Sequence, residues 1–192
     1  PAVHLFTQSG GKLLYNENKS YFYPGKNSLE QISIGSCTGI FNLKKIINDT
    51  YKKVNEFLKT NIKNEILLSD IKSGSFENIW LIPSNKVPGK TKSFVDFQND
   101  STANDIKLAL REGFKSIEHV KRYTTTGMAT DQGKIANMHA LGIISEHTKT
   151  KIGELGTTTF RPPYTPLTFG ALVGRNVKKF FDITRRTPIH SW

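Results

Sequence analysis

The residues best suited to bind a ligand or do chemistry lie in one stretch, residues 119–134, which reads HVKRYTTTGMATDQGK. Lys121 and Arg122 bring two adjacent positive charges, and three consecutive threonines follow them: Thr124, Thr125 and Thr126. Hydroxyls and glycines at a helix start leave backbone N–H groups accessible, which suits a phosphate or another anion. The alternative interpretation is a polar turn between two packed helices, which the residue types alone favour.

Two further segments carry groups that could meet a ligand or a partner. Residues 32–34 alternate like a strand and lead into a glycine-bearing turn at residues 35–39, and a helical pattern follows as far as Leu58. Strand, glycine turn and helix is the order in which α/β folds present a cofactor. Residues 157–166 contain three prolines, which predicts an extended segment, and the Arg161 guanidinium in it could face an acidic partner.

Familiar catalytic and metal-binding patterns are missing from this sequence. It has no glycine–serine elbow, P-loop or paired-histidine helix motif, and its five histidines are widely scattered. The single cysteine, Cys37, excludes an internal disulfide and a cysteine-only metal cluster. We therefore expect no catalytic residue, no metal ligand and no catalysis by this chain alone.

The net charge of +11 raises the question of nucleic-acid binding. Residues 1–92 hold thirteen Lys/Arg against seven Asp/Glu, and residues 93–192 hold fourteen against nine, so the excess is spread over both halves. A small basic nucleic-acid-binding module stays an alternative, but we expect no nucleic-acid partner. No apolar run is long enough to span a membrane and no leader is visible, which predicts a cytoplasmic protein without a membrane partner.

Periodicity predicts an α+β fold, with short strands in the first part and helices in the second. The expected strands are residues 1–6, 13–15, 20–23, 32–34, 78–82 and 94–97. The expected helices cover residues 41–58, a run from a capping box at Thr102 to Gly113, a run after Ser116, residues 135–144, and a short helix that begins at Thr148 or Thr150 and ends at Leu155.

Six stretches together resemble the middle of the alpha subunit of heterotetrameric sarcosine oxidases. They are VHLF with QSGGK (3–12), SFVDFQ (93–98), EHVKRYTT (118–125), GMATDQGK (127–134), GTTTFRPPYTP (156–166) and RRTP (185–188). The stretches cover most of the chain in the order of the family, whereas residues 59–92 match weakly. A related alternative is a subunit of an FAD/FMN amine or proline dehydrogenase.

The resemblance implies a division of the chain. Residues 1–60 would be the C-terminal part of an NAD-binding domain, 61–91 a connector with a strand, 92–174 a small helical domain, and 175–192 the start of a folate-binding, aminomethyltransferase-like domain. It also implies a complex with beta, gamma and delta subunits that demethylates sarcosine oxidatively to glycine and passes the one-carbon unit to tetrahydrofolate. FAD would lie in the partner subunit and FMN at the subunit interface.

The resemblance also implies roles for particular residues. Part of an NAD site would include the glycine turn and the start of the following helix: Gly35, Ser36, Gly39, Phe41 and Leu43. The FMN or the subunit interface would meet Lys121, Arg122, Thr124, Thr125, Thr126 and Arg161. The competing internal account pairs Lys121 or Arg122 with Asp131 or Glu118.

The small helical domain resembles the [2Fe–2S] ferredoxin-like domains of related dehydrogenase subunits, which hold their cluster with four cysteines. Aligned on shared residues, those cysteines would fall at Asp96, Gln98, Asp131 and Ala136. A cluster of this kind needs four thiolates. The resemblance therefore implies that the scaffold is kept without an iron–sulfur cluster.

Overall fold

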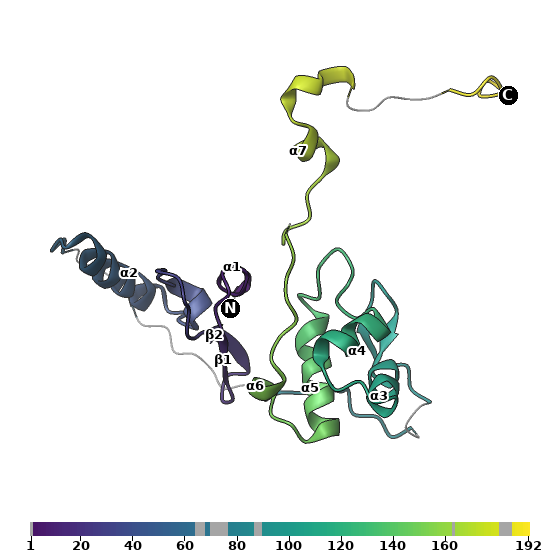
Figure 1. Ribbon diagram of the computed structural model, residues 1–192, viewed down its shortest axis with the longest axis horizontal. Coiled ribbons are helices and arrows are strands. Elements are labelled where there is room, and N and C mark those ends of the chain that lie inside the picture. The colour runs from purple at the N-terminus through teal and green to yellow at the C-terminus, as the bar shows by residue number, and fades with distance from the viewer. Residues whose placement is uncertain (1, 64–67, 70–76, 87–89, 163, 181–185) are drawn as a thin grey trace.

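A computed structural model describes residues 2–63, 68–69, 77–86, 90–162, 164–180 and 186–192. It confirms a mixed α+β architecture, in which an N-terminal part with a hairpin and a long helix lies beside a helical part, and the C-terminal residues extend away from both (Figure 1). Among the described residues, no helix combines the length and the apolar character needed to cross a membrane.

The chain starts with a short helix where we expected a strand. Helix α1 covers His4–Gln8 and buries Phe6. Two hydrogen bonds end it, from Gly11 N to Phe6 O and from Gly10 N to Thr7 O, and Gly10 has a φ of +82°. This is a Schellman motif, which stabilises a helix C-terminus and needs a residue without Cβ strain at the left-handed position. The expectation of a strand over residues 1–6 was wrong for the described residues 2–6.

The two short strands predicted after residue 12 are present, and they pair with each other as a hairpin. Strand β1 (Leu13–Asn16) pairs antiparallel with β2 (Tyr21–Pro24), and the register sets Leu14 opposite Tyr23. Phe22 is buried and joins the main hydrophobic core, while Leu13 and Tyr15 pack against that core. The hairpin therefore packs against the helical part of the molecule.

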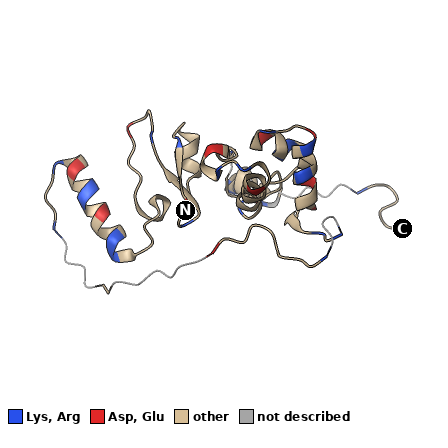
Figure 2. Cartoon of the chain, turned by 90° about the horizontal axis from the view of Figure 1, so that it is seen from below, with Lys and Arg blue, Asp and Glu red and all other residues tan. Residues whose placement is uncertain are grey.

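The glycine turn and the long helix after it were predicted in the right places. The turn contains a 3-10 helix, η1 (Gly35–Thr38), and helix α2 (Leu43–Leu58) starts at Asn42, whose side chain accepts a hydrogen bond from Lys45 N at 3.0 Å. Cationic and acidic side chains alternate along α2 (Figure 2). The strand expected at residues 32–34 is absent, because β1 and β2 pair with each other and neither pairs with this segment.

The helical part begins with a second strand pair and a capped helix. Strand β3 (Phe94–Asp96) pairs antiparallel with β4 (Ser101–Thr102) through an irregular register. Helix α3 (Ala103–Arg111) follows, with the predicted capping box between Thr102 and Asp105. It ends in a Schellman motif at Gly113, because Phe114 N bonds to Ala109 O and Gly113 N bonds to Leu110 O.

Helix α4 (Ile117–Thr124) starts at Ser116 as predicted, although the Ser116 side chain forms no capping hydrogen bond. Helix α5 (Ala136–Thr148) is the centre of the core, with Leu141, Ile143 and Ile144 each at most 2% exposed. The strand expected at residues 78–82 is absent. Trp80 instead packs on α5, where its ring lies so close to Gly142 that a Cβ there would be 2.2 Å from it.

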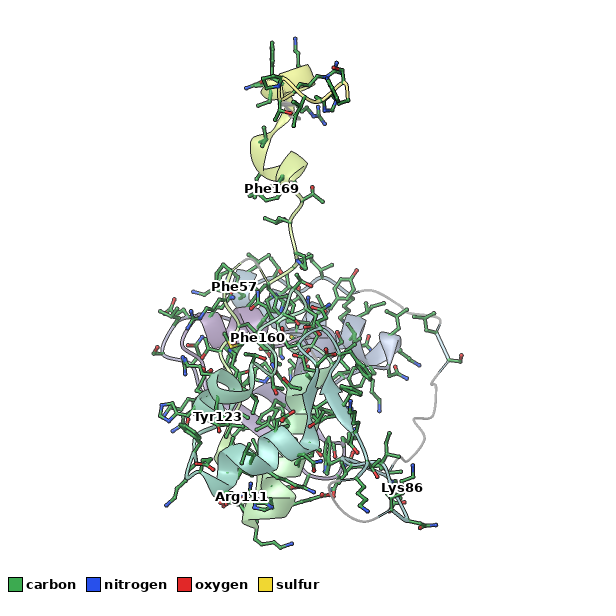
Figure 3. The ribbon with its side chains drawn as sticks, turned by 90° about the vertical axis from the view of Figure 1, so that its right-hand side faces the viewer. Phe57, Lys86, Arg111, Tyr123, Phe160 and Phe169 are labelled. Carbon is green, nitrogen blue, oxygen red and sulfur yellow. The ribbon has the colours of Figure 1, made fainter. Side chains whose placement is uncertain are left out.

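The last described elements are short. Helix α6 (Ile152–Leu155) ends where predicted but starts at Lys151, not at Thr148 or Thr150, because Thr148 closes α5. Helix α7 (Phe169–Val173) and the 3-10 segment η2 (Arg175–Phe180) lie on the projecting C-terminal part, where Phe169 stands away from the body that contains Phe160 (Figure 3). Much of the expected connector (64–67, 70–76, 87–89), Pro163 and Arg185 lie outside the described residues.

Candidate functional site

The cationic pair Lys121–Arg122 lies in the last turn of α4 and shares one carboxylate. Glu118 Oε2 is 3.9 Å from Lys121 Nζ and 3.3 Å from Arg122 Nη2. Arg122 Nη1 also donates to the Glu118 carbonyl at 3.0 Å. The internal pairing considered from the sequence is therefore present with Glu118. Two charges on one carboxylate leave an excess positive charge at this end of α4.

Arg161 reaches the same region from the extended segment 157–166. Its backbone N–H donates to Gln132 Oε1 at 2.9 Å, and its carbonyl accepts from Gln132 Nε2 at 2.8 Å. Thr159 N donates to Glu118 Oε1 at 2.8 Å. Side-chain amide and carboxylate groups thus supply the backbone hydrogen bonds that a neighbouring strand would give.

Four consecutive residues of this segment are held by four different elements. Thr158 Oγ1 accepts from Asn137 of α5, and Thr159 N donates to Glu118 of α4. The Phe160 carbonyl accepts from Gln8 of α1, and Arg161 pairs with Gln132 of the loop before α5. The position of the Arg161 backbone is therefore set by contacts from both parts of the molecule.

A cavity of about 280 Å³ opens between α4, the loop and this segment. Its lining brings three cations together, while the only carboxylate described in contact with them is Glu118, so the local charge is positive. Such a site attracts anions, and guanidinium groups bind phosphate or carboxylate in a bidentate way. The lining residues are Lys121, Arg122, Gly127, Met128, Gln132, Thr159 and Arg161.

The three threonines take a different place from the one expected. They end α4 and do not start a helix, and Thr125 is its left-handed C-cap with a φ of +60°. Thr124 is buried and donates to Val120 O, with its hydroxyl 2.8 Å from that of Thr126. A helix C-terminus carries partial negative charge, so the backbone of α4 does not help to bind an anion here, and the attraction comes from the side chains of Lys121 and Arg122. None of the three lines the cationic cavity.

The loop that carries Gly127 and Gln132 is held by Asp96, the last residue of β3, and by Gln98 in the turn that follows. Asp96 is 4% exposed and accepts from Gly127 N at 2.7 Å, and its other oxygen accepts from Gln98 N and Asn99 N at 3.0 Å each. Gln98 Oε1 accepts from the backbone and the hydroxyl of Thr130, both at 3.0 Å. These bonds fix the loop that forms one wall of the cavity.

Two of the four positions aligned with cluster cysteines, Asp96 and Gln98, thus bind the loop that contains a third, Asp131. Asp131 accepts from Gly133 N at 3.1 Å, and Ala136 is buried at the start of α5. Within the described ranges, no group of three or more His, Cys, Asp or Glu side chains is arranged to hold a metal ion.

The glycine turn lies in the N-terminal part, and none of its residues is among the described lining of the cationic cavity. Gly35 is buried, and a Cβ on Gly39 would lie 2.1 Å from the hydroxyl of Tyr21, which donates to the Gly39 carbonyl at 3.1 Å. Packing therefore already requires glycine at position 39. Ser36, Phe41 and Leu43 are exposed, and the Phe41 ring meets the edge of Tyr21.

Sequence reasoning missed several residues that complete the cavity: Met128, Gln132 and Thr159. Gln132 and Met128 lie within residues 119–134, but the contact from Gln132 to Arg161 spans 29 residues of sequence. A local pattern gives no sign of such a contact. One sequence signal could have indicated a turn at Gln132, namely the glycine that follows it, Gly133. In the structure Gln132 has a φ of +50°.

Comparison with protein families and known proteins points to one group. Residues 90–175 match the family model described as "Sarcosine oxidase A3 domain". Over its whole length the chain is 39% identical to the sarcosine oxidase subunit alpha of Rhizobium meliloti strain 1021. It is 36% and 33% identical to the corresponding subunits of Corynebacterium sp. strains P-1 and U-96. The chain spans about a fifth of the length of these relatives (20–21%).

A solved structure shares the fold. The crystal structure of L-proline dehydrogenase from P. horikoshii superposes with a TM-score of 0.61 over 91% of this chain and 37% of that one, at 18% identity. The alpha-subunit resemblance drawn from the sequence motifs is confirmed by the relatives, which cover the whole chain.

Proposed function

Because the chain is homologous along its whole length to a fifth of the alpha subunits of sarcosine oxidases, and residues 90–175 match their A3 domain, we propose that it is a cofactor-flanking, subunit-contacting segment of such a subunit. In the intact complex, a flavin in the beta subunit would oxidise sarcosine to glycine. The one-carbon unit would pass to tetrahydrofolate on a folate-binding domain. This segment contributes no catalytic group of its own.

The observation that carries the proposal is the cationic cavity. Lys121, Arg122 and Arg161 converge on it, and Glu118 answers only part of their charge. With a volume of about 280 Å³ it is too small for a whole flavin nucleotide but suits a phosphate or one edge of a flavin ring. The rest of FMN would lie against the beta subunit, and the cavity would bind its anionic end.

The three cations differ in how they are held, and this divides their roles. Arg122 is engaged by Glu118 through an ion pair and a backbone hydrogen bond. Within the described residues, the Arg161 guanidinium has no ion pair or hydrogen bond, while its backbone is fixed by Gln132. Arg161 is therefore the side chain most available to an incoming anion. Thr124 and Thr126 support the end of α4 from inside, and Thr125, exposed at that end, is left as a contact for the partner.

The test uses Arg161→Ala and Arg122→Ala in the assembled complex, with Arg111→Ala on α3 as a matched control. Arg161→Ala should lower FMN content and subunit association, by about tenfold or more in affinity, since a charge-assisted hydrogen bond contributes about 1.5–3 kcal/mol. The melting temperature of the alpha subunit should stay unchanged. Arg122→Ala should lower FMN content and subunit association and also the melting temperature, because Arg122 is paired with Glu118 inside the chain. A lower melting temperature for Arg161→Ala with FMN and association intact would contradict the proposal.

A partial NAD site is proposed at the glycine turn. Packing against Tyr21 already explains Gly39, and a φ of +85° explains Gly35, so contact with NAD would come from Ser36, Phe41 and Leu43, beside the N-terminus of α2. Ser36→Trp should weaken NAD binding to the full complex, because the bulky ring would occupy the approach to the turn. Asn18→Trp, at an exposed position in the turn of the neighbouring hairpin, is the control. Unchanged NAD affinity in Ser36→Trp would remove this site.

We also propose that the helical part holds no iron–sulfur cluster, because four thiolates are needed and the chain has one cysteine. Purified protein should contain no iron and no acid-labile sulfide. Iron at near-stoichiometric amounts would overturn both this proposal and the alignment behind it. It would favour a related amine or proline dehydrogenase subunit.

A further inference from the structure

A second cavity, separate from the cationic one, lies where the N-terminal hairpin, α5 and residues 157–164 meet. Its volume is about 320 Å³, which falls in the range of small-molecule sites. Three segments far apart in sequence close it, so it exists only when the two parts of the molecule are together. Its lining includes Phe22, Lys134, Met138, Leu141, Thr158 and Phe160.

The walls of this cavity are mainly apolar. Phe22 and Leu141 belong to the buried core and form its inner side. Met138 and Phe160 form the sides, and a methionine thioether adapts its shape to an aromatic ring and contacts it favourably. An occupant therefore needs an apolar body, and a flat ring fits walls made of aromatic and methionine side chains.

Two polar residues of the lining, Lys134 and Thr158, can donate hydrogen bonds to an occupant. Lys134 Nζ donates one described hydrogen bond, to Tyr164 O at 3.1 Å, and lies 4.2 Å from the Tyr164 ring centroid, so further N–H protons remain. Thr158 is 4% exposed; its hydroxyl accepts from Asn137 and keeps its own proton. None of the described lining residues is acidic. One ammonium and one hydroxyl donor match a single negative charge.

We propose that this cavity binds a small aromatic monocarboxylate, with the carboxylate at Lys134 and Thr158 and the ring between Met138 and Phe160. The charge decides between ligand classes. A phosphate ester would carry about two negative charges at neutral pH and would be attracted more strongly to the three cations of the other cavity. A neutral aromatic compound would gain nothing from the charge of Lys134 and would offer the Thr158 hydroxyl no anionic acceptor. The inference does not rest on the proposed cofactor site, because the two cavities share no cation.

The test is isothermal titration calorimetry of the full chain with 3-phenylpropanoate and with 3-phenylpropanol, which lacks the charge. The carboxylate should bind with a stoichiometry of one, and the alcohol about tenfold more weakly or worse, because it forms no charge-assisted hydrogen bond. Lys134→Met keeps the apolar stem and should reduce carboxylate affinity to that of the alcohol. Lys134→Arg should retain it. Lys115→Met makes the same charge change in an exposed loop and should bind like the unaltered chain.

A second variant tests the cavity without touching the charge. Met138→Phe fills part of the space and should weaken binding of both compounds by about tenfold or more, with the melting temperature reporting that the chain is folded. Absence of binding at millimolar carboxylate would show a packing gap only and overturn the proposal. So would equal carboxylate affinity in the unaltered chain and in folded Lys134→Met.

Discussion

Helices α2 and α5 have similar lengths, yet they bury their side chains to opposite extents. Along α5 six residues are buried, whereas none of the described residues of α2 is. Both helices have clear apolar periodicity or content in the sequence, so both were predicted. The difference shows that a pattern predicts a helix without predicting the surface that it packs against. Stability of the chain should therefore depend on α5 and hardly on α2.

The largest expected effect is a core substitution in α5 set against one in α2. Ile144 is fully buried, so Ile144→Ala should cost about 2–5 kcal/mol of unfolding free energy, from lost apolar burial and the cavity left behind. Leu58→Ala at the exposed end of α2 should stay within about 0.5 kcal/mol. Urea unfolding of both variants measures the difference. Equal losses would mean that α2 is packed in solution.

A smaller effect is expected at the buried carboxylate that holds the loop before α5. Asp96→Ala leaves the buried Gly127 N–H without its acceptor, which costs about 1–3 kcal/mol, and frees two further N–H groups toward solvent. Glu112→Ala, at an exposed position, is the control. Chemical denaturation should separate them, and matching stabilities would show that water replaces the Asp96 bonds without cost.

The helix starts offer a finer comparison. Thr102 and Ser116 occupy the same N-cap position in α3 and α4, but only Thr102 forms a side-chain capping hydrogen bond. Thr102→Ala should lower stability by about 1 kcal/mol, and Ser116→Ala by clearly less. Thermal unfolding of the two variants checks this. A loss at Ser116 as large as that at Thr102 would indicate a cap formed in solution.

The smallest effect concerns the contact between the two parts of the molecule, and it depends on pH. His4 of α1 stacks on Tyr164 with ring centroids 3.5 Å apart. Burial, and then the Lys134 ammonium, lower the pKa of His4 from its usual 6.5. The unfolded chain therefore binds a proton at higher pH than the folded one. This contribution to stability is present above about pH 6.5 and lost as the pH falls below it.

His4→Phe keeps an aromatic ring but removes the titration. Lowering the pH from 7.5 to 5.5 should reduce the melting temperature more for the unaltered chain than for this variant. Equal shifts would place the pH dependence on other groups.

Much of the fold could be predicted where local chemistry decides. The hairpin, the Thr102–Asp105 box and the end of α3 at Gly113 follow from short-range hydrogen bonds. The same Schellman bonds that close α3 at Gly113 also close α1 at Gly10, yet the residue pattern of α1 predicts a strand. Five residues are too few to display a helical period, so only the Ser-Gly-Gly end carried the signal.

The rest depended on distant contacts. Residues 78–82 have strand-like composition, but Trp80 finds its place on Gly142 of α5, and no local pattern reveals that. In the candidate site, Lys121, Arg122 and Arg161 were identified by residue type and resemblance. Lys121 and Arg122 pair with Glu118, three and four residues away, as the sequence allowed. The segment that carries Arg161 depends on distant partners, because Gln132 is 29 residues from Arg161 and Glu118 is 41 residues from Thr159.

The four anchors on residues 158–161 have a consequence for hydrogen exchange. This segment has neither helix nor strand, and such segments usually exchange their amide protons quickly. Here Thr159 N and Arg161 N are bonded to side chains from α4 and from the loop before α5, so exchange requires these hydrogen bonds to open first. Helix α7 has regular backbone bonds but buries no residue, and it can open alone. The irregular segment should therefore be protected longer than the helix that follows it.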